Sequence, residues 1–193
     1  MAFSLNGVAQ KGMNGIGINI PVGTGDGFTW VGVGVKYQYN ISDYFRIEPS
    51  FEYSPVYSKK DYLGVVDDYN YIKMNAFLNG HIFLMAPRPI RPYVLLGAGF
   101  TQWGCADISN TYAYNSFYQS KYSVYVYDDT EECFSYHAGL GCDFRLTHNI
   151  AMQIEATAFS SAAGSGTAKS AIVDHNHNGK WYFVGRLGFA YTF

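Results

Sequence analysis

The chain ends in the stretch GRLGFAYTF, residues 185–193, and this stretch decides the fold class. Its apolar side chains stand at every second position, whereas Arg186, Gly188 and Thr192 stand between them. Side chains that alternate with a period of two lie on opposite faces of a β-strand. The stretch therefore predicts a strand with one apolar and one polar face. The apolar face is made of Leu187, Phe189, Tyr191 and Phe193.

The same alternation continues through almost the whole sequence, and no stretch has the period of an amphipathic helix. It predicts eight strands, at residues 15–22, 30–39, 45–53, 71–84, 94–101, 134–145, 150–158 and 181–193. Short turns are expected at residues 41–44, 86–91 and 147–149, and longer loops at residues 23–28, 54–70, 104–132 and 160–179. The short turns then fall at one end of the sheet together with both chain termini, and the long loops fall at the other. This arrangement, with an even number of strands, is typical of transmembrane β-barrels.

The composition excludes several classes of protein. Aromatic residues make up 18% of the 193 residues and charged residues only 15%, so the chain has ample surface to bury and is not disordered. A net charge of -2 provides no basic field for nucleic acid. No stretch approaches 18 consecutive apolar residues, so transmembrane helices are not expected. What remains is one all-β domain, either soluble or embedded in a membrane as a barrel.

The distribution of charge favours the membrane barrel. In the third expected strand, Arg46, Glu48 and Glu52 share one face, opposite an apolar face. An Arg or Lys that faces lipid costs about 2–4 kcal/mol at mid-bilayer, which is enough to enforce this separation. We therefore predict an eight-stranded antiparallel up-and-down barrel whose apolar side chains face lipid and whose charges pair inside a narrow lumen. The predicted lumen charges are Lys36, Arg46, Glu48, Glu52, Lys73, Asp143, Arg145, Glu155 and Arg186.

The final stretch also resembles the terminal strand of bacterial outer-membrane proteins, which typically end in Phe with aromatic or apolar residues at alternating positions before it. With the eight-strand layout, the chain resembles the small OmpA/OmpX-type barrels and the porin-family outer-membrane β-barrel domain over about residues 12–193. The resemblance implies export to the periplasm, delivery by periplasmic chaperones and insertion into a Gram-negative outer membrane by the barrel-assembly machinery. That machinery would read an assembly signal formed by Leu187, Phe189, Tyr191 and Phe193.

Residues 1–11 are expected to lie outside the single barrel domain of residues 12–193. The segment has no basic region, but Gly7-Val8-Ala9 has the small-x-small form of a signal-peptide cleavage site. It is therefore either the remainder of a signal peptide or an N-terminal tail in the periplasm.

Four polar residues raise a catalytic alternative. Ser135 and His137 share the polar face with Asp143 and Glu155, so a nucleophile, a base and an orienting acid can be read into them. Lipid A deacylases are eight-stranded outer-membrane barrels, but their motif places His two residues before Ser and faces the lipid. Here the order is reversed and the pair faces the lumen. Hydrogen bonding inside the barrel is the simpler explanation, so no catalytic residue is assigned.

Residues 174–179, DHNHNG, begin like an EF-hand loop. The twelfth position, where such a loop needs a bidentate Glu, is Gly185 in the last strand. An Asn-Gly turn that opens this strand explains the segment more simply. Neither a metal ion nor a cofactor is therefore expected.

The longest loop, residues 104–132, is notable for cysteine and tyrosine. Cys105 and Cys133 lie at its two ends on neighbouring strands, where an oxidising environment permits a disulfide if the two residues lie opposite one another. Cys142 lies on the apolar face as a small hydrophobic side chain. Tyrosine density of this kind is typical of recognition surfaces, although strands merely prolonged above the bilayer explain it equally well. The loop tyrosines are Tyr112, Tyr114, Tyr118, Tyr122, Tyr125 and Tyr127.

These observations predict a non-enzymatic outer-membrane protein that acts in membrane structure, adhesion or ligand contact through its Tyr-rich surface loops. Its expected partners are outer-membrane lipid and an unknown extracellular ligand, and nucleic acid is not among them. An eight-stranded barrel is just wide enough for its own side chains, so general diffusion through it is not expected. The alternatives are a narrow gated channel, a lipid-modifying outer-membrane enzyme and a soluble ligand-binding barrel.

Overall fold

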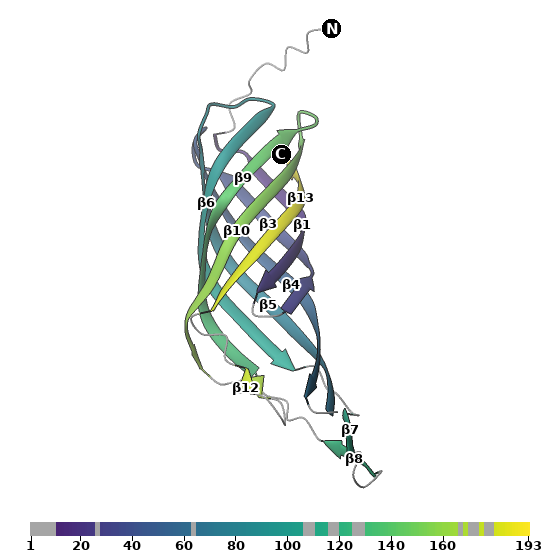
Figure 1. Cartoon of the computed structure of the whole chain (residues 1–193). Helices are drawn as coiled ribbons and strands as arrows, with labels where there is room; N and C mark the ends of the chain where they lie inside the picture. The colour runs from purple at the N-terminus through teal and green to yellow at the C-terminus, as the bar shows by residue number, and fades with distance from the viewer. Residues whose placement is uncertain are drawn as a thin grey trace.

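The structure, a computed structural model, consists of β-strands that wind around a single axis (Figure 1). It describes residues 11–25, 28–62, 65–105, 111–115, 120–124, 130–165, 168–169, 174–175 and 180–193. Within these ranges no helix is long and apolar enough to cross a membrane. The strands are β1 (Asn14–Gly25), β2 (Phe28–Val31), β3 (Val33–Asn40), β4 (Phe45–Tyr62), β5 (Val65–Phe83), β6 (Ile90–Cys105), β7 (Thr111–Asn115), β8 (Ser120–Val124), β9 (Thr130–Arg145), β10 (Ile150–Ser165), β11 (Ala168–Lys169), β12 (Asp174–His175) and β13 (Trp181–Thr192).

The strands form a closed antiparallel barrel. β1 pairs with β13 on one side and with β2 and β3 on the other, so the first and last strands of the chain close the sheet. Around the barrel the order is β1, β2 with β3, β4, β5, β6, β9, β10 and β13. β2 and β3 follow one another across Gly32 and act as one strand, which gives the eight strands that the sequence predicts. Outside this ring, the hairpin β7–β8 pairs with β5, and β11 pairs with β12.

The connections define two ends of the barrel. The turn end carries the short links of residues 41–44, 84–89 and 146–149. It also carries the last residue, because Phe193 and Asn14 exchange two backbone hydrogen bonds of 2.9 and 3.2 Å. The loop end carries the longer segments, including the β7–β8 hairpin (Figure 1). The predicted grouping of the short turns at one end is confirmed. At the other end, most of the expected loops of residues 23–28 and 54–70 lies in strands.

Several strands are longer than the sequence indicates. The expected loop of residues 54–70 is mostly a paired ribbon, because β4 and β5 stay in register from Ser54 opposite Lys73 to Tyr62 opposite Val65. β6 and β10 likewise continue toward the loop end, to Cys105 and Ser165. The alternation of apolar side chains fades in these extensions, so the periodicity that marks the membrane-spanning part gives no signal there.

Pro49 breaks the regularity of β4 on one side only. The sequence predicts a bulge or irregular pairing at this position, because proline has no N–H to donate to a neighbouring strand. Toward β5 the ladder runs through Pro49 opposite Leu78 without interruption. Toward β3 no pair is formed between Lys36–Ser50 and Tyr39–Ile47, although the register is the same on both sides of the gap. Pro49 therefore opens the β3–β4 ladder without a bulge.

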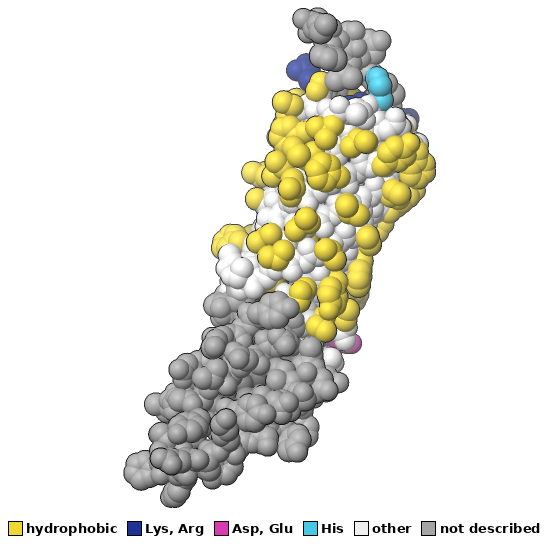
Figure 2. All heavy atoms as spheres, turned by 90° about the vertical axis from the view of Figure 1, so that its right-hand side faces the viewer, with side chains coloured by type: hydrophobic (Ala, Val, Ile, Leu, Met, Phe, Trp, Pro, Cys, Tyr) yellow, Lys and Arg dark blue, Asp and Glu magenta, His cyan; other side chains and the backbone are white. Residues whose placement is uncertain are grey.

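The side chains confirm that the barrel is apolar outside and polar inside. Val33, Leu140 and Phe189 are 63%, 65% and 44% exposed, whereas Glu48 and Arg186 are 2% and 6% exposed. Figure 2 shows hydrophobic side chains spread over the outer wall between the two ends, with basic and histidine side chains gathered at the turn end. An exposed apolar surface of this extent suits a hydrocarbon environment rather than water.

Candidate functional site: the barrel interior

The layer nearest the turn end is built around an arginine–aspartate pair. Arg46 of β4 reaches across the lumen to Asp143 of β9, with Nη2 2.8 Å from Oδ2. Arg46 Nε also donates to Asn40 Oδ1 at 3.1 Å, and Gln153 Nε2 donates to Asp143 Oδ1 at 2.8 Å. Both ions are buried. They therefore have the hydrogen-bonding partners that charged groups need once they leave water.

Arg91 belongs to the same layer, although the sequence pattern predicts a turn at residues 86–91 and so gave no sign of an inward side chain there. Arg91 is buried, and its guanidinium carbon lies 3.7 Å from the ring centre of Phe83. Its Nη2 donates to the backbone oxygen of Asp43 at 2.7 Å. The guanidinium carbon of Arg46 lies 4.8 Å from the same ring, so Phe83 attracts both cations through its π-face. The alternation of β6, extended backwards from Tyr93, would have identified Arg91 as an inward-facing residue.

Two carboxylates share one lysine in the middle layer. Lys36 Nζ lies 3.5 Å from Glu48 Oε2 and 3.7 Å from Glu155 Oε1. Gln38 Nε2 donates to Glu48 Oε2 at 2.7 Å, and the Tyr93 hydroxyl donates to Glu155 Oε1 at 2.7 Å. Asn79 Nδ2 also donates to Glu48 Oε1 at 3.4 Å, so each carboxylate combines the shared ammonium with at least one neutral hydrogen-bond donor.

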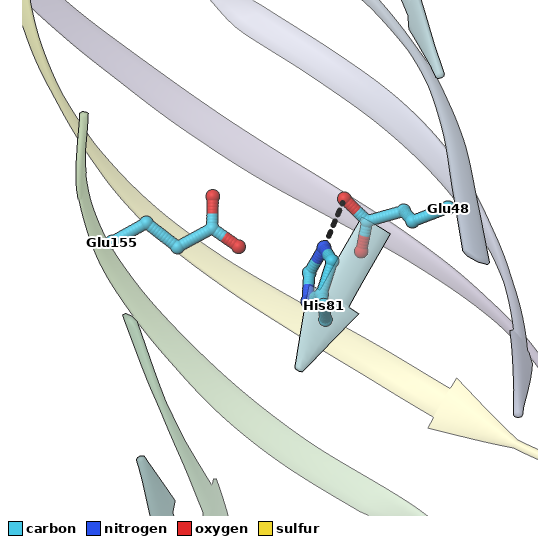
Figure 3. A group of neighbouring side chains, drawn as sticks. All are labelled: Glu48, His81 and Glu155. Carbon is cyan, nitrogen blue, oxygen red and sulfur yellow. Dashed lines mark ion pairs between the residues drawn. The ribbon is translucent and has the colours of Figure 1, made fainter. Parts of the chain in front are cut away.

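His81 completes this cluster (Figure 3). Its Nε2 lies 3.6 Å from Glu48 Oε1, and its ring stacks on that of Tyr93 with 4.6 Å between the ring centres. Figure 3 shows the imidazole directed toward Glu48, with the Glu155 carboxylate facing both from the opposite wall.

The cluster also has the residue types of a metal site. One ligand atom each from Glu48, His81 and Glu155 lies within 4.8 Å of the others, and carboxylate and imidazole suit several divalent ions. The Lys36 ammonium, however, already touches both carboxylates and supplies positive charge between them. We therefore interpret the group as a buried ion-pair cluster.

A third ion pair follows toward the loop end. Arg186 of β13 contacts the Glu52 carboxylate through Nε at 2.5 Å and Nη2 at 3.3 Å, and its Nη1 donates to Thr157 Oγ1 at 2.8 Å. Asn19 Nδ2 and Asn75 Nδ2 each donate to one oxygen of Glu52 at 3.1 Å. The Arg186 fork and the two amides satisfy both carboxylate oxygens, so this is a well-paired buried salt bridge.

An aromatic collar surrounds Lys73 on the loop side of these pairs. We define the collar as Trp30, Trp103, Phe159 and Tyr182, which come from β2, β6, β10 and β13. Their ring centres lie 4.0, 5.0, 4.2 and 5.8 Å from Lys73 Nζ, in that order. The four rings and the lysine are each no more than 2% exposed. Attraction between the ammonium group and these rings offsets part of the cost of burying it.

The collar rings also touch one another across the lumen. The ring centres of Trp30 and Tyr182 are 5.5 Å apart. The ring centre of Trp103 lies 6.0 Å from that of Trp30 and 5.8 Å from that of Tyr182. Phe159 and Tyr182 are 5.7 Å apart. Because the rings come from strands around the whole circumference, the collar and Lys73 fill the cross-section of the barrel at this level.

The structure does not join Ser135 to His137. Both side chains are buried, but the Ser135 hydroxyl is hydrogen-bonded to that of Ser161 at 3.0 Å. The His137 ring packs edge-on against Phe77, with 4.6 Å between the ring centres. Among the described residues, neither nitrogen of His137 has a hydrogen-bond partner. The arrangement therefore lacks the contact between nucleophile and base that the catalytic alternative requires.

Of the predicted lumen charges, Arg145 departs from the expectation. The other charges are buried inside the barrel, but Arg145 is half-buried at the end of β9. It lies where the strand leaves the barrel at the turn end, so it is a rim residue and not part of the packed interior. Arg91, and not Arg145, is the second arginine packed into the layer of Arg46 and Asp143.

The register does not bring the two loop cysteines together. Cys133 lies opposite Thr101, and Cys105 lies four residues farther along β6, opposite Tyr71 of β5. At about 3.3 Å per residue the two cysteine backbones are roughly 13 Å apart along the strands, whereas a disulfide needs Cα atoms within about 7 Å. The prediction of a disulfide is not supported by this pairing. Cys142 is half-buried in β9, where the sequence analysis expected a small apolar side chain.

The remaining predicted residues lie at the barrel's outer wall and loop end. The side chains of the predicted assembly signal, Leu187, Phe189, Tyr191 and Phe193, are all exposed on the outside, as their apolar face predicts. Their role in assembly stays a prediction. Tyr112 and Tyr114 lie in β7 and Tyr122 in β8, while Tyr118, Tyr125 and Tyr127 lie outside the described residues. The role of these tyrosines in recognition also stays a prediction.

Comparison with known proteins identifies the family. Residues 3–193 match the model of the outer membrane protein beta-barrel domain. The chain belongs to this family. Its place is therefore the cell outer membrane, in agreement with the apolar outer wall. A search of curated proteins finds no match.

Solved structures of other outer-membrane barrels share this fold. Neisserial surface protein A (NspA) superposes with a TM-score of 0.63 at 8% identity, over 94% of this chain and 96% of that one. A major outer membrane protein from Thermus thermophilus gives 0.56 at 11% identity, over 93% and 99%. OprG from Pseudomonas aeruginosa gives 0.53 at 16% identity, over 95% and 96%. At these identities the similarity shows the fold alone.

Proposed function

We propose that this outer-membrane barrel is a non-conducting, non-enzymatic surface protein whose loop-end segments contact an extracellular ligand. The observation that carries the proposal is the filled lumen: three layers of buried ion pairs lie below an aromatic collar around Lys73. With the interior occupied in this way, the barrel serves as a rigid support for what it holds above the membrane. Neisserial surface protein A, with the same fold, is named as a surface protein, which agrees with this role.

The two rival functions fit the interior less well. A gated channel would need Lys73 and the collar rings to move together, although each is held by several contacts. A lipid-modifying enzyme would need an accessible nucleophile, but Ser135 is buried and bonded to Ser161. The filled lumen and the buried serine therefore both favour a contact function at the loop end.

Conductance across a planar bilayer tests the closed lumen. The wild-type protein is expected to give no steady ion current, because the collar fills the cross-section. The double substitution Trp30→Ala and Trp103→Ala removes two collar rings and is expected to produce current steps. The control, Phe100→Ala with Phe134→Ala, removes two lipid-facing rings and is expected to stay silent. Steady current through the wild-type barrel would refute the proposal.

Adhesion of intact cells tests the loop contact. Cells that display the wild-type protein are expected to bind a monolayer of cultured epithelial cells several-fold better than cells without it. Replacing Tyr112, Tyr114 and Tyr122 by Ser is expected to remove most of this difference, because tyrosine supplies large contact areas at low entropic cost. Tyr44→Ser, at the turn end, is the matched control. Equal adhesion with and without the protein would contradict the contact function.

We also propose that the barrel-assembly machinery and periplasmic chaperones are the partners of the chain during insertion. The support is the outward row of Leu187, Phe189, Tyr191 and Phe193 on the last strand. Phe193→Ala is expected to lower the amount of folded protein in the outer membrane several-fold while refolding in detergent is unchanged. Equal amounts of both proteins in the membrane would remove the support for this partner.

A further inference from the structure

An apolar groove runs along the outer wall where β1, β3, β4 and β13 lie side by side. Its volume is about 800 Å³. Its floor is formed by Gly17, Lys36, Ser50 and Ala190. The side chains of Lys36 and Ala190 are buried, so these residues line the groove with their backbone side. The walls include Ile18, Val35, Tyr37, Phe51, Ile150 and Phe189.

The groove coincides with the irregular part of the barrel wall. Pro49 lies in its lining and marks the place where β3 and β4 lose their pairing. The compact proline ring stands between the larger outward side chains of Tyr37 and Phe51. The residue that interrupts the β3–β4 ladder therefore also contributes a small outward ring to the groove lining.

The turn end of the groove changes from apolar to polar. The Tyr37 hydroxyl donates to Asn14 Oδ1 at 2.5 Å, and Asn149 Nδ2 donates to the backbone oxygen of Thr192 at 2.7 Å. These contacts mark the level at which the membrane wall meets water, since tyrosine and amide groups favour that interface. The groove therefore reaches from the hydrocarbon region to the headgroup region on one side of the membrane.

A positive charge stands at this polar end. Lys11 is exposed, and the next residue, Gly12, is fixed to the end of β3 by a backbone hydrogen bond of 2.7 Å to Asn40. His148 is exposed in the turn that precedes Ile150, one of the groove walls. Figure 2, which views this side of the barrel, shows basic and histidine side chains at the turn end beyond the hydrophobic band.

We propose that this groove binds one anionic phospholipid of the periplasmic leaflet, with its acyl chains in the groove and its headgroup phosphate beside Lys11. The apolar walls suit acyl chains, and a lysine at the interface attracts an anionic headgroup. The turn end faces the periplasm in this fold, so the lipid comes from the inner leaflet of the outer membrane. His148 is a second donor within the same rim.

Charge argues against a second copy of the chain as the occupant. Two copies that pair through this groove inside a membrane are related by an axis along the membrane normal, so their turn ends lie on the same side. The Lys11 side chains of both copies would then lie at the same rim, and like charges at an interface are unfavourable. A phosphate group neutralises this rim, whereas a second barrel adds to its charge.

Native mass spectrometry of the full chain in detergent tests the proposal, with phosphatidylglycerol and phosphatidylcholine as the two probes. One phosphatidylglycerol is expected to remain bound per barrel, and phosphatidylcholine is expected to bind several-fold more weakly. Lys11→Gln is expected to weaken phosphatidylglycerol binding about fivefold, since one lysine near an anionic lipid surface contributes about 1 kcal/mol. Arg88→Gln, at the turn between β5 and β6, is the matched control and is expected to leave binding unchanged.

Filling the groove tests the acyl-chain part. Val35→Trp is expected to abolish retention of both lipids, and Leu140→Trp, on the lipid face of β9, is the control of equal bulk. Ile18→Trp serves as a second groove variant if Val35→Trp fails to refold, as judged by heat-modifiable migration on gels. Equal lipid retention by groove and control variants, no effect of Lys11→Gln, or a dimer in place of bound lipid would each overturn the proposal.

Discussion

Replacing Arg186 by methionine examines whether the lumen behaves as a dry core of paired charges. The guanidinium of Arg186 contacts both oxygens of Glu52 and also donates to Thr157. Methionine keeps most of the aliphatic length of arginine and removes the charge. Glu52, which is 2% exposed, then keeps Asn19 and Asn75 as donors and loses its ionic partner.

The size of the effect follows from the burial of the pair. Removing one partner of a buried ion pair costs about 3–5 kcal/mol, because an uncompensated charge stays behind. Since two amides still donate to Glu52, we expect Arg186→Met to lower the free energy of unfolding by about 3 kcal/mol, at the lower end of that range. The double variant Glu52→Gln with Arg186→Met buries no charge at this level. It is expected to lie within about 1 kcal/mol of the wild type, because a neutral replacement of a buried pair is often tolerated.

Urea unfolding of protein refolded into lipid vesicles measures these differences, with tryptophan fluorescence as the signal. Migration of unheated samples on SDS gels reports independently whether the barrel is closed. A loss below about 1 kcal/mol for Arg186→Met would mean that water screens the pair, as it does for exposed salt bridges. A double variant as unstable as the sum of the single ones would mean that the two residues act independently. Either result would refute the description of the interior as a sealed ion-pair core.

Three further experiments test the architecture. Leu140→Arg puts a charge on the lipid face and is expected to lower the free energy of unfolding by about 2–4 kcal/mol, measured by the same urea titration. Spin labels at Leu95→Cys and Leu96→Cys, 1% and 53% exposed, are expected to differ in collisions with membrane-dissolved oxygen, and equal relaxation would contradict the assigned faces. Gly99→Ala is expected to cost about 1–3 kcal/mol, because its added carbon would overlap with a backbone carbonyl of β5. Gly185→Ala is the control, since its added carbon lies no closer than 3.9 Å to a neighbour, and equal stability of the two variants would disprove the crowding at Gly99.

The sequence predicted the faces of the barrel well because lipid and lumen impose opposite demands on alternate residues. Arg46, Glu48 and Glu52 were assigned to the interior from parity alone, and all are buried there. The same rule failed beyond the membrane. In residues 54–70 neither face of the β4–β5 ribbon must be apolar, so the paired strands carry a polar sequence that indicates a loop.

The partners inside the lumen could not be derived in the same way. The position of a residue in the alternation predicts that its side chain points inward. It does not predict how far along the barrel axis the side chain lies or which residues it contacts. Glu52 and Arg186 are 134 residues apart in the chain, and the stagger of eight strands decides that they share a layer. The collar around Lys73 was missed for this reason, since its rings come from four different strands and each stands alone in its local sequence.

The alternation of apolar and polar side chains also determines how hydrophobic the unfolded chain is. Its mean hydropathy is -0.08, because polar and small residues alternate with apolar ones along most of the spanning strands. An unpaired strand of this kind has no long oily segment with which to enter a bilayer as a helix. A continuous apolar surface forms only when neighbouring strands pair, because pairing places the apolar side chains on one face of the sheet and the polar ones on the other. The same alternating sequence therefore keeps the unfolded chain free of long apolar segments and gives the closed barrel a continuous apolar surface.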